Sequence, residues 1–188
     1  MGTALNSVTV AFLAAAEGTE QSELQVPWQH IKDEGGRPLL ISPAEDEIQL
    51  FEHLDRGAKM PVDVPLSEAK PVEYDALVLP GGVANPDQLR MDPAAVRLVW
   101  QFFASGKPVA AICHAPWTLV EADVVRDRTL TSWPSLQTDI RNAGATWVDE
   151  EVVVCEKGQN TLITSRKPDD LPAFCRTFTE HFAAAKHS

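Results

Sequence analysis

The 188-residue sequence has few cysteines, few positive charges and no long apolar segment. Its three cysteines include no CxxC spacing, so they do not suggest a disulfide framework and are typical of a reducing compartment. Lys and Arg number 16 against 27 Asp and Glu, giving a net charge of −11, which argues against binding nucleic-acid phosphates or an anionic membrane. No run of about 18 apolar residues could span a bilayer, and a basic signal-peptide start is missing. We therefore expect a cytoplasmic protein that binds neither nucleic acid nor membrane.

Metal-ligand patterns and repeats are missing as well. No group of cysteines and histidines has the spacing of metal ligands, so the sequence predicts no metal site and no cofactor. Internal repeats, low-complexity segments and domain linkers are also absent. We expect residues 1–188 to form a single domain, long enough to bury a substantial core.

Apolar segments alternate with amphipathic ones along the whole chain. The pattern predicts strands at 8–13, 37–42, 76–79 and 109–112, short strands at 152–154 and 162–164, and helices at 20–34, 93–105 and from about 168. Strands that are apolar throughout are covered on both faces. The sequence therefore predicts an α/β fold, with a mostly parallel sheet between two helix layers. Residues 43–71 are expected to form a small hairpin or flap at the sheet edge.

The apolar run at 109–112 ends abruptly in Cys113 and His114, and helical sequence follows. This is the pattern of a buried strand that turns sharply into a helix, which exposes the sulfur above the sheet beside helix N–H groups. The small residues Ala111 and Ala115 leave room for such a turn. A buried structural cysteine is the alternative, because free cysteine is often buried. The adjacent histidine makes us favour a nucleophile.

Ligands of open α/β sheets collect at the carboxyl ends of the strands. Three predicted strand ends carry polar residues there: the acidic segment 17–24, the Gly81-Gly82 turn, and the pair Cys113-His114. Together they are compatible with a cysteine-nucleophile site, in which a glycine N–H approaches the substrate oxygen. Each also has a structural alternative: a first-turn acid favoured by the helix dipole, a plain turn, and a histidine packed at a helix start.

Six segments in order carry a family resemblance. They are residues 20–24, 79–82, 111–114, 131–135, 142–145 and 164–168. With these segments the chain resembles the PfpI family of intracellular cysteine hydrolases and stress proteins, within the class I glutamine amidotransferase-like superfamily. The resemblance covers nearly the whole chain. It implies a flavodoxin-like three-layer sandwich with the nucleophile on a strand-to-helix turn.

The resemblance also implies roles for individual residues. Cys113 is the nucleophile, and Glu20 matches the family acid that hydrogen-bonds the sulfur, whereas Glu17 and Glu23 lie nearby but do not match that position. His114 matches the histidine beside the nucleophile. In the family a carboxylate reaches this histidine from a neighbouring subunit.

Asp87 is the nearest match to that carboxylate, which implies a homodimer or a higher homo-oligomer such as a hexamer. Gly81 and Gly82 are expected to bind the substrate oxygen. Trp117 and Trp133 are candidates for the pocket wall, with core packing as the alternative for each, because tryptophan is highly buried on average.

The reactivity of the sulfur depends on its proton. A thiol with an ordinary pKa near 8.5 is mostly protonated at pH 7. A helix N-terminus and His114 could lower the pKa of Cys113, whereas a carboxylate opposes this unless it keeps a proton. We therefore expect Cys113 and Glu20 to titrate as a coupled pair, with Glu20 available as a general acid.

Glutamine amidotransferase activity is excluded on sequence grounds, because no His-x-Glu pair follows the cysteine. Three classes of function remain. The first is a hydrolase in which Cys113 attacks small carbonyl compounds, their protein adducts (deglycase or glyoxalase-like chemistry) or peptides. The second is an oxidative-stress sensor in which Cys113 becomes sulfenic or sulfinic acid. The third is a chaperone-like scaffold. We favour the hydrolase and place the sensor second.

Overall fold

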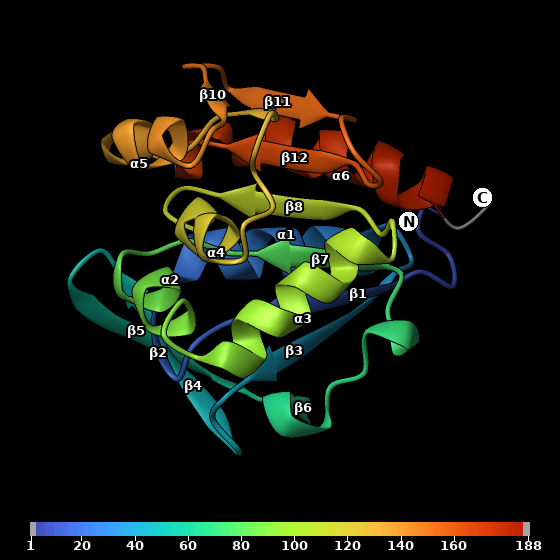
Figure 1. Cartoon of the computed structure of the whole chain (residues 1–188). Helices are drawn as coiled ribbons and strands as arrows, with labels where there is room; N and C mark the ends of the chain where they lie inside the picture. Colours follow the sequence, from blue (N-terminus) through green and yellow to red (C-terminus); the bar gives the residue numbers. More distant parts are fainter. Residues whose placement is uncertain (1–2, 186–188) are drawn as a thin grey trace.

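The computed structural model describes residues 3–185 and is built on a seven-stranded sheet with the order β11-β12-β8-β7-β1-β3-β6 (Figure 1). These strands are β1 (Thr9–Leu13), β3 (Arg37–Ser42), β6 (Val64–Pro65), β7 (Ala76–Leu79), β8 (Val109–Ile112), β11 (Val152–Cys155) and β12 (Leu162–Ser165). Every neighbouring pair is parallel except β11 and β12, which are antiparallel. The mostly parallel sheet predicted from the apolar runs is confirmed.

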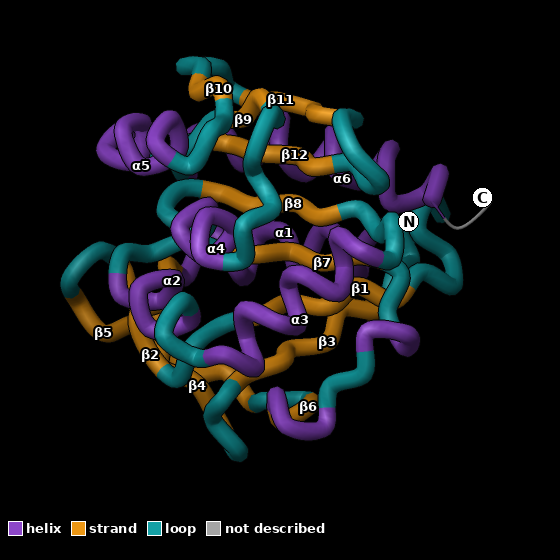
Figure 2. The backbone as a smooth tube through the Cα atoms, viewed as in Figure 1, coloured by secondary structure: helices purple, strands orange, loops and turns teal. Residues whose placement is uncertain are grey.

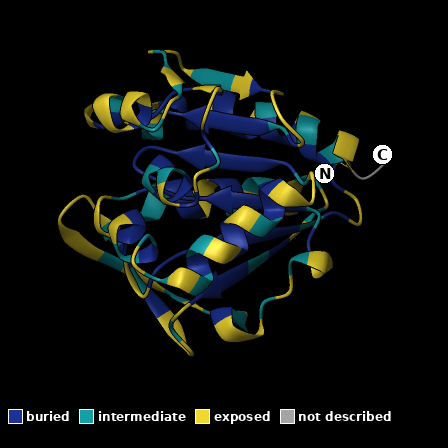
Figure 3. Ribbon diagram, in the orientation of Figure 1, coloured by how far each residue is buried: buried dark blue, intermediate teal, exposed yellow. Residues whose placement is uncertain are grey.

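Helices cover both faces of this sheet (Figures 1 and 2). One face carries α1 (Gln21–Asp33) and α6 (Leu171–Ala185), and the other carries α2 (Ala84–Leu89), α3 (Pro93–Ala104) and α4 (Pro116–Glu121). Alternating strand residues enter the two cores: Val10 and Phe12 pack with α1 and α6, and Ala11 and Leu13 pack with α3 and α4. Figure 3 shows the central strands buried and the outer helix faces exposed. The flavodoxin-like three-layer sandwich is thereby confirmed.

A separate three-stranded sheet forms the predicted flap. Strands β4 (Glu47–Glu52) and β5 (Asp55–Pro61) make an antiparallel hairpin, and β4 pairs in parallel with β2 (Glu17–Glu20). At the hairpin tip, His53 has a left-handed backbone conformation with φ 57°. The hairpin prediction is confirmed, and β2 attaches it to the segment that leads into α1.

Short elements complete the chain. They are β9 (Thr129–Leu130), β10 (Thr146–Trp147), α5 (Gln137–Asn142) and the 3-10 turns Leu66–Glu68, Pro71–Glu73, Pro134–Leu136 and Pro168–Asp170. The sequence pattern predicted neither β2 nor the two-residue strands, because such short pairings depend on partners elsewhere in the fold. Among the described helices, none combines the length and the apolar composition that crossing a bilayer would require.

Candidate active site

Cys113 occupies a strained turn between β8 and α4. Its φ of 63° lies in the left-handed region, where a non-glycine residue costs about 1–2 kcal/mol. Two backbone hydrogen bonds hold the turn: the Cys113 N–H donates to the Ser165 carbonyl (3.1 Å), and the Trp133 N–H donates to the Cys113 carbonyl (2.9 Å). The residue is 7% exposed and lines a cavity of about 830 Å³. The predicted strand-to-helix turn with a sulfur at a cavity is therefore present.

Glu23 is the carboxyl group beside the sulfur. It lies in the first turn of α1, it is 0% exposed, and its carboxyl group and the Cys113 thiol interact, each affecting the pKa of the other. Its Oε2 accepts the Gly81 N–H at 2.9 Å, and its buried Oε1 has no hydrogen-bond partner among the described residues. Burial raises the pKa of Glu23 to about 8, so the carboxyl group is mostly protonated at pH 7.

The assignment of the sulfur-bonded acid to Glu20 is wrong. Glu20 is the last residue of β2 and the N-cap residue of α1, and its Oε2 accepts the backbone N–H of His53 at 3.1 Å. Glu23 follows about one helical turn later and faces the sheet. The signal that could have found it is its place on the apolar stripe of α1, which also buries Leu24, Pro27 and Ile31. A carboxyl group on a buried stripe needs a partner, and here the partner is the thiol.

The two glycines stand where no side chain fits. A Cβ at Gly81 would lie 2.3 Å from Glu23 Oε2 and 2.6 Å from the Cβ of Cys113. Gly82 has φ 86°, and a Cβ there would lie 2.1 Å from the carbonyl oxygen of Gly18. The backbone N–H of Gly82 lies close enough to Cys113 and Glu23 to lower the pKa of both groups. This donor faces the reacting sulfur and is suited to a developing oxyanion.

His114 places a ring nitrogen beside the sulfur. Its Nδ1 lies 3.2 Å from Sγ of Cys113. The ring stacks on Trp133 with centroids 5.9 Å apart and meets the edge of Trp117 at 5.2 Å. Burial lowers the pKa of His114, so the imidazole is neutral at pH 7. With its proton on Nε2, the neutral ring can accept the thiol proton at Nδ1.

The protonation of the sulfur differs from the expectation. Burial raises the pKa of Cys113, and the adjacent Glu23 raises it further, while the N–H groups of Gly82 and His114 act in the opposite direction. Desolvation of the anion is the largest of these effects and outweighs the two N–H groups. Cys113 is therefore a thiol at rest and needs a base at the moment of attack. The carboxyl group that interacts with it is that of Glu23, not Glu20.

Both predicted tryptophans line the cavity. Trp117 also packs partly against the core beneath α3 and α4, and its Nε1 donates to Asp139 Oδ2 at 2.9 Å. Trp133 is 39% exposed. Trp117 thus both lines the cavity and packs against the core, whereas Trp133 mainly lines the cavity.

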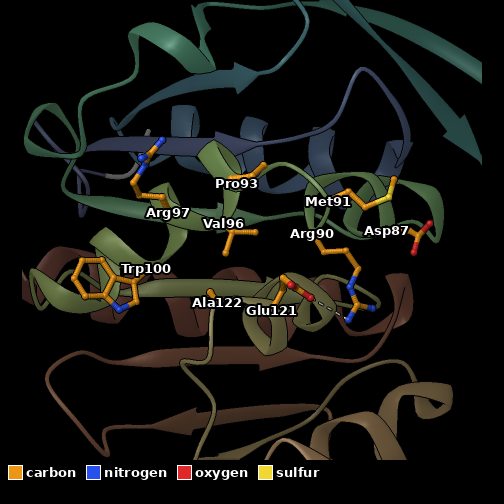
Figure 4. A pocket seen from close by; sticks show the side chains of 9 residues that line it. All are labelled: Asp87, Arg90, Met91, Pro93, Val96, Arg97, Trp100, Glu121 and Ala122. Carbon is orange, nitrogen blue, oxygen red and sulfur yellow. Dashed lines mark ion pairs between the residues drawn. The ribbon is translucent and has the colours of Figure 1, made fainter.

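Asp87 lines the same cavity and is exposed. Within residues 3–185 no hydrogen bond joins Asp87 to His114, so a contact from a second copy stays a prediction. Asp87 also borders a neighbouring cavity of about 910 Å³ between α2, α3 and α4 (Figure 4). In that cavity Arg90 pairs with Glu121 at 3.5 Å.

Asn85 is a buried residue of the site that the sequence analysis did not identify. Its Nδ2 donates to the carbonyl oxygens of Pro80 (2.9 Å) and Gly81 (3.1 Å), which fixes the glycine turn. Nothing in the sequence distinguishes it from an ordinary helix-start asparagine. In the described part of the chain, no group of three or more His, Cys, Asp or Glu residues is arranged to hold a metal ion.

Comparisons with known proteins agree on one family. Residues 8–181 match the DJ-1/PfpI family. The chain is 39% identical over 171 residues to Deglycase PfpI of Pyrococcus furiosus, a match covering 91% of this chain and 97% of that protein. It is 39% identical over 157 residues to General stress protein 18 of Bacillus subtilis, covering 84% and 88% of the two chains. Among solved structures, Drosophila melanogaster DJ-1beta superposes with a TM-score of 0.83 at 24% identity, covering 96% and 95%.

Proposed function

Because the chain belongs to the DJ-1/PfpI family, we propose that it is a stress-response deglycase in which Cys113 is the nucleophile. The observation that carries the proposal is the placement of the thiol between a protonated carboxyl group and a neutral imidazole, at the wall of a cavity. Similarity to a protein named a deglycase, over nearly its whole length, supports this activity. Similarity to a protein named a general stress protein supports the physiological setting.

The first step forms the nucleophile and a carbon–sulfur bond. An adduct of a 2-oxoaldehyde collapses to amine and aldehyde when Glu23 protonates the departing nitrogen and the adduct hydroxyl supplies the replacement proton. The sulfur of Cys113 adds to the aldehyde carbon, its proton passes to His114 Nδ1, and the carbonyl π electrons move to oxygen beside the Gly82 N–H. At pH 7 the neutral acid and the neutral base are both in the state that this step requires.

The second step regenerates the thiol. Glu23, neutral again after the adduct collapses, gives its proton to the oxyanion, which forms the hemithioacetal and leaves Glu23 ionised. The carboxylate then takes the proton from the former aldehyde carbon and returns it to the neighbouring ketone carbon while the hydroxyl proton passes to the ketone oxygen, which converts the hemithioacetal into a 2-hydroxy thioester. One water then cleaves the thioester: a water proton goes to Glu23, the hydroxide adds to the acyl carbon, and His114 returns its proton to the departing sulfur, giving a 2-hydroxy acid and free Cys113. Starting from the adduct, the overall reaction consumes one water and releases an amine and a 2-hydroxy acid, with no net redox change.

The test measures turnover of a methylglyoxal adduct of an N-acetylated amino acid. The assay detects the 2-hydroxy acid that the reaction releases. Cys113→Ala should abolish turnover, and Glu23→Gln should lower it by about a hundredfold, the usual contribution of a general acid. Glu150→Gln, which changes an exposed loop carboxylate, is the matched control. Turnover that survives in Cys113→Ala would overturn the proposal.

The protonated Glu23 also favours a second candidate, the oxidative-stress sensor. Each peroxide molecule would transfer one oxygen to the sulfur and leave as water, and the carboxyl group would donate a hydrogen bond to the resulting sulfinate. Intact mass spectra would then show two oxygens added at Cys113 in the wild type, and the sulfinate would be less persistent in Glu23→Ala. Absence of turnover together with this mass gain would favour the sensor over the deglycase.

A further inference from the structure

A buried positive charge lies apart from the Cys113 cavity. Arg128, just before β9, is 7% exposed, and its guanidinium carbon lies 5.1 Å from the ring centroid of Phe103. Its Nη1 donates to the carbonyl oxygen of Asn160 at 3.1 Å, and its Nη2 donates to Oδ1 of the same residue at 2.6 Å. Both acceptors are neutral, and none of the ion pairs among residues 3–185 includes Arg128. A guanidinium keeps its charge in proteins, so this cation is buried without a carboxylate partner.

Cys155 lies close enough to this guanidinium to interact with it. It is the last residue of β11, it belongs to the same core cluster as Phe103, and it is 7% exposed. Burial lowers the pKa of Arg128, and Cys155 acts in the opposite direction, because negative charge on the sulfur stabilises the guanidinium. An anionic group at position 155 would therefore compensate the buried positive charge.

The loop from 156 to 161, which joins β11 to β12, lies against the guanidinium (Figure 1). The backbone at Gly158 comes so close that a Cβ there would lie 2.7 Å from Nη2 of Arg128. Residues 156–159 are exposed, whereas Asn160 is buried and donates from Nδ2 to the carbonyl oxygen of Lys107 at 2.9 Å. A local opening of this exposed loop is therefore enough to admit a reagent as small as hydrogen peroxide.

The other charged groups of this region are either exposed or bound elsewhere. Asp127, Glu156 and Lys157 are exposed, so water and salt screen their charges. Lys107 directs its ammonium group to two backbone carbonyl oxygens of the segment before β7. Arg128 is therefore the buried charge that an anion at position 155 would meet.

We propose that Cys155 is an oxidation site separate from the Cys113 cavity, at which hydrogen peroxide converts the thiol into a sulfinate that pairs with Arg128. The guanidinium favours this reaction in two ways. It stabilises the negative charge on the sulfur that attacks peroxide, and it donates charge-assisted hydrogen bonds to the oxygens of the product. Two of its five N–H donors are used by Asn160, so further donors remain for the sulfinate.

The reaction takes two peroxide molecules. In each step the sulfur attacks one peroxide oxygen, the O–O bond breaks, and the departing hydroxide takes up a proton and leaves as water. The sulfur is oxidised by four electrons in total, two peroxide molecules are reduced to two waters, and one proton is released with the sulfinate. Neither Cys113 nor the proposed deglycase reaction takes part, so this inference can be tested separately from the proposed function.

The first experiment measures oxidation of each cysteine in the native protein. Peptide mass spectrometry after peroxide treatment follows the gain of two oxygens at each position. Cys175 is the matched control within the chain, because it is 4% exposed and its neighbour Arg176 is exposed. Cys155 should gain two oxygens about tenfold faster than Cys175, the effect of one charge-assisted contact. Arg128→Gln, whose amide can still donate to Asn160, should remove most of this difference.

A second experiment measures the charge effect without oxidation. Aspartate at position 155 places a carboxylate near the position of the sulfinate, and asparagine is its neutral counterpart of the same size. Cys155→Asp should therefore have a Tm a few degrees higher than Cys155→Asn, measured by differential scanning calorimetry. In the Arg128→Gln background this order should reverse, because the carboxylate is then buried without a cation.

Three results would each overturn the inference. They are equal oxidation rates at Cys155 and Cys175, an oxidation rate at Cys155 that Arg128→Gln leaves unchanged, and a Tm of Cys155→Asp at or below that of Cys155→Asn when Arg128 is present. If Arg128→Gln does not fold, the two cysteine rates in the wild type and the comparison of aspartate with asparagine still decide the question.

Discussion

Oδ1 of Asn85 accepts a hydrogen bond from the backbone N–H of Ala15 at 2.7 Å. The same side chain binds the carbonyl oxygens of Pro80 and Gly81 through Nδ2. One fully buried amide thus joins the end of β1 to the turn after β7. The position of the Gly82 N–H, which faces the sulfur, therefore depends on a side chain that does not itself touch the sulfur.

Replacing this amide should affect both stability and activity. Asn85→Ala leaves the Ala15 N–H and two carbonyl oxygens without their partners, so we expect the free energy of unfolding to fall by about 2–4 kcal/mol. Urea unfolding followed by tryptophan fluorescence measures the change. A loss below about 0.5 kcal/mol, the range of ordinary surface substitutions, would mean that water replaces the amide without cost.

Gly81→Ala should disrupt the acid–thiol pair directly. The new Cβ would overlap Glu23 Oε2 at 2.3 Å and the Cβ of Cys113 at 2.6 Å, so one of the two side chains has to move. Overpacking of this kind costs about 1–3 kcal/mol of stability. Turnover should fall, and the alkylation rate of Cys113 by iodoacetamide should change because the sulfur is displaced. Wild-type values for both rates would contradict the close packing at this turn.

The pH dependence of stability should reveal the proton on Glu23. Its folded-state pKa of about 8 lies above the ordinary 4.5, so between these values the native state holds a proton that the unfolded chain releases. Stability from this group is therefore complete at acidic pH and is lost as pH rises towards 8, with a slope of up to about 1.4 kcal/mol per pH unit.

Glu23→Gln removes that titration. The difference in unfolding free energy between variant and wild type should grow in favour of the variant from pH 5 to pH 8, as urea titrations at several pH values would record. A difference that stays constant over this range would show that Glu23 is ionised in the folded protein.

Asp87→Asn tests whether a second copy completes the site. If Asp87 contacts His114 of the partner subunit, the substitution should lower turnover while Cys113 remains accessible to alkylation. Dilution of the wild type should lower specific activity in parallel with the loss of the dimer, observed by analytical ultracentrifugation. Undiminished activity in a dilute monomer would rule out the contact between subunits.

The main elements of the fold are predictable from the sequence because the spacing of apolar residues differs between its helices and its strands. The apolar runs at 109–112 and 76–79 are too short for amphipathic helices and too apolar for exposed strands, so they identify a covered parallel sheet. The turn at Cys113 is predictable for the same reason, since it follows directly from where the strand must end. The strand β2 carries no such pattern, and its existence depends on β4.

The identity of the acid was missed because a motif gives spacing along the chain but not the direction in which each side chain points. Glu20 and Glu23 are both carboxylates in one short segment, and the difference arises only when α1 packs on the sheet. The helix must bury Leu24 and Ile31, and that orientation carries Glu23 inward and leaves Glu20 with the flap. The raised pKa of Cys113 was missed likewise, because desolvation depends on burial that a sequence does not display.

The left-handed backbone at Cys113 also has an evolutionary consequence. Glycine adopts this conformation more readily than cysteine does, so the turn between β8 and α4 does not need a sulfur in order to form. A descendant of this chain with glycine at position 113 could keep the architecture and lose the reaction. A single substitution at position 113 can therefore remove the reactive sulfur without changing the fold. The presence of this fold in a related chain does not by itself establish that the chain has the nucleophile.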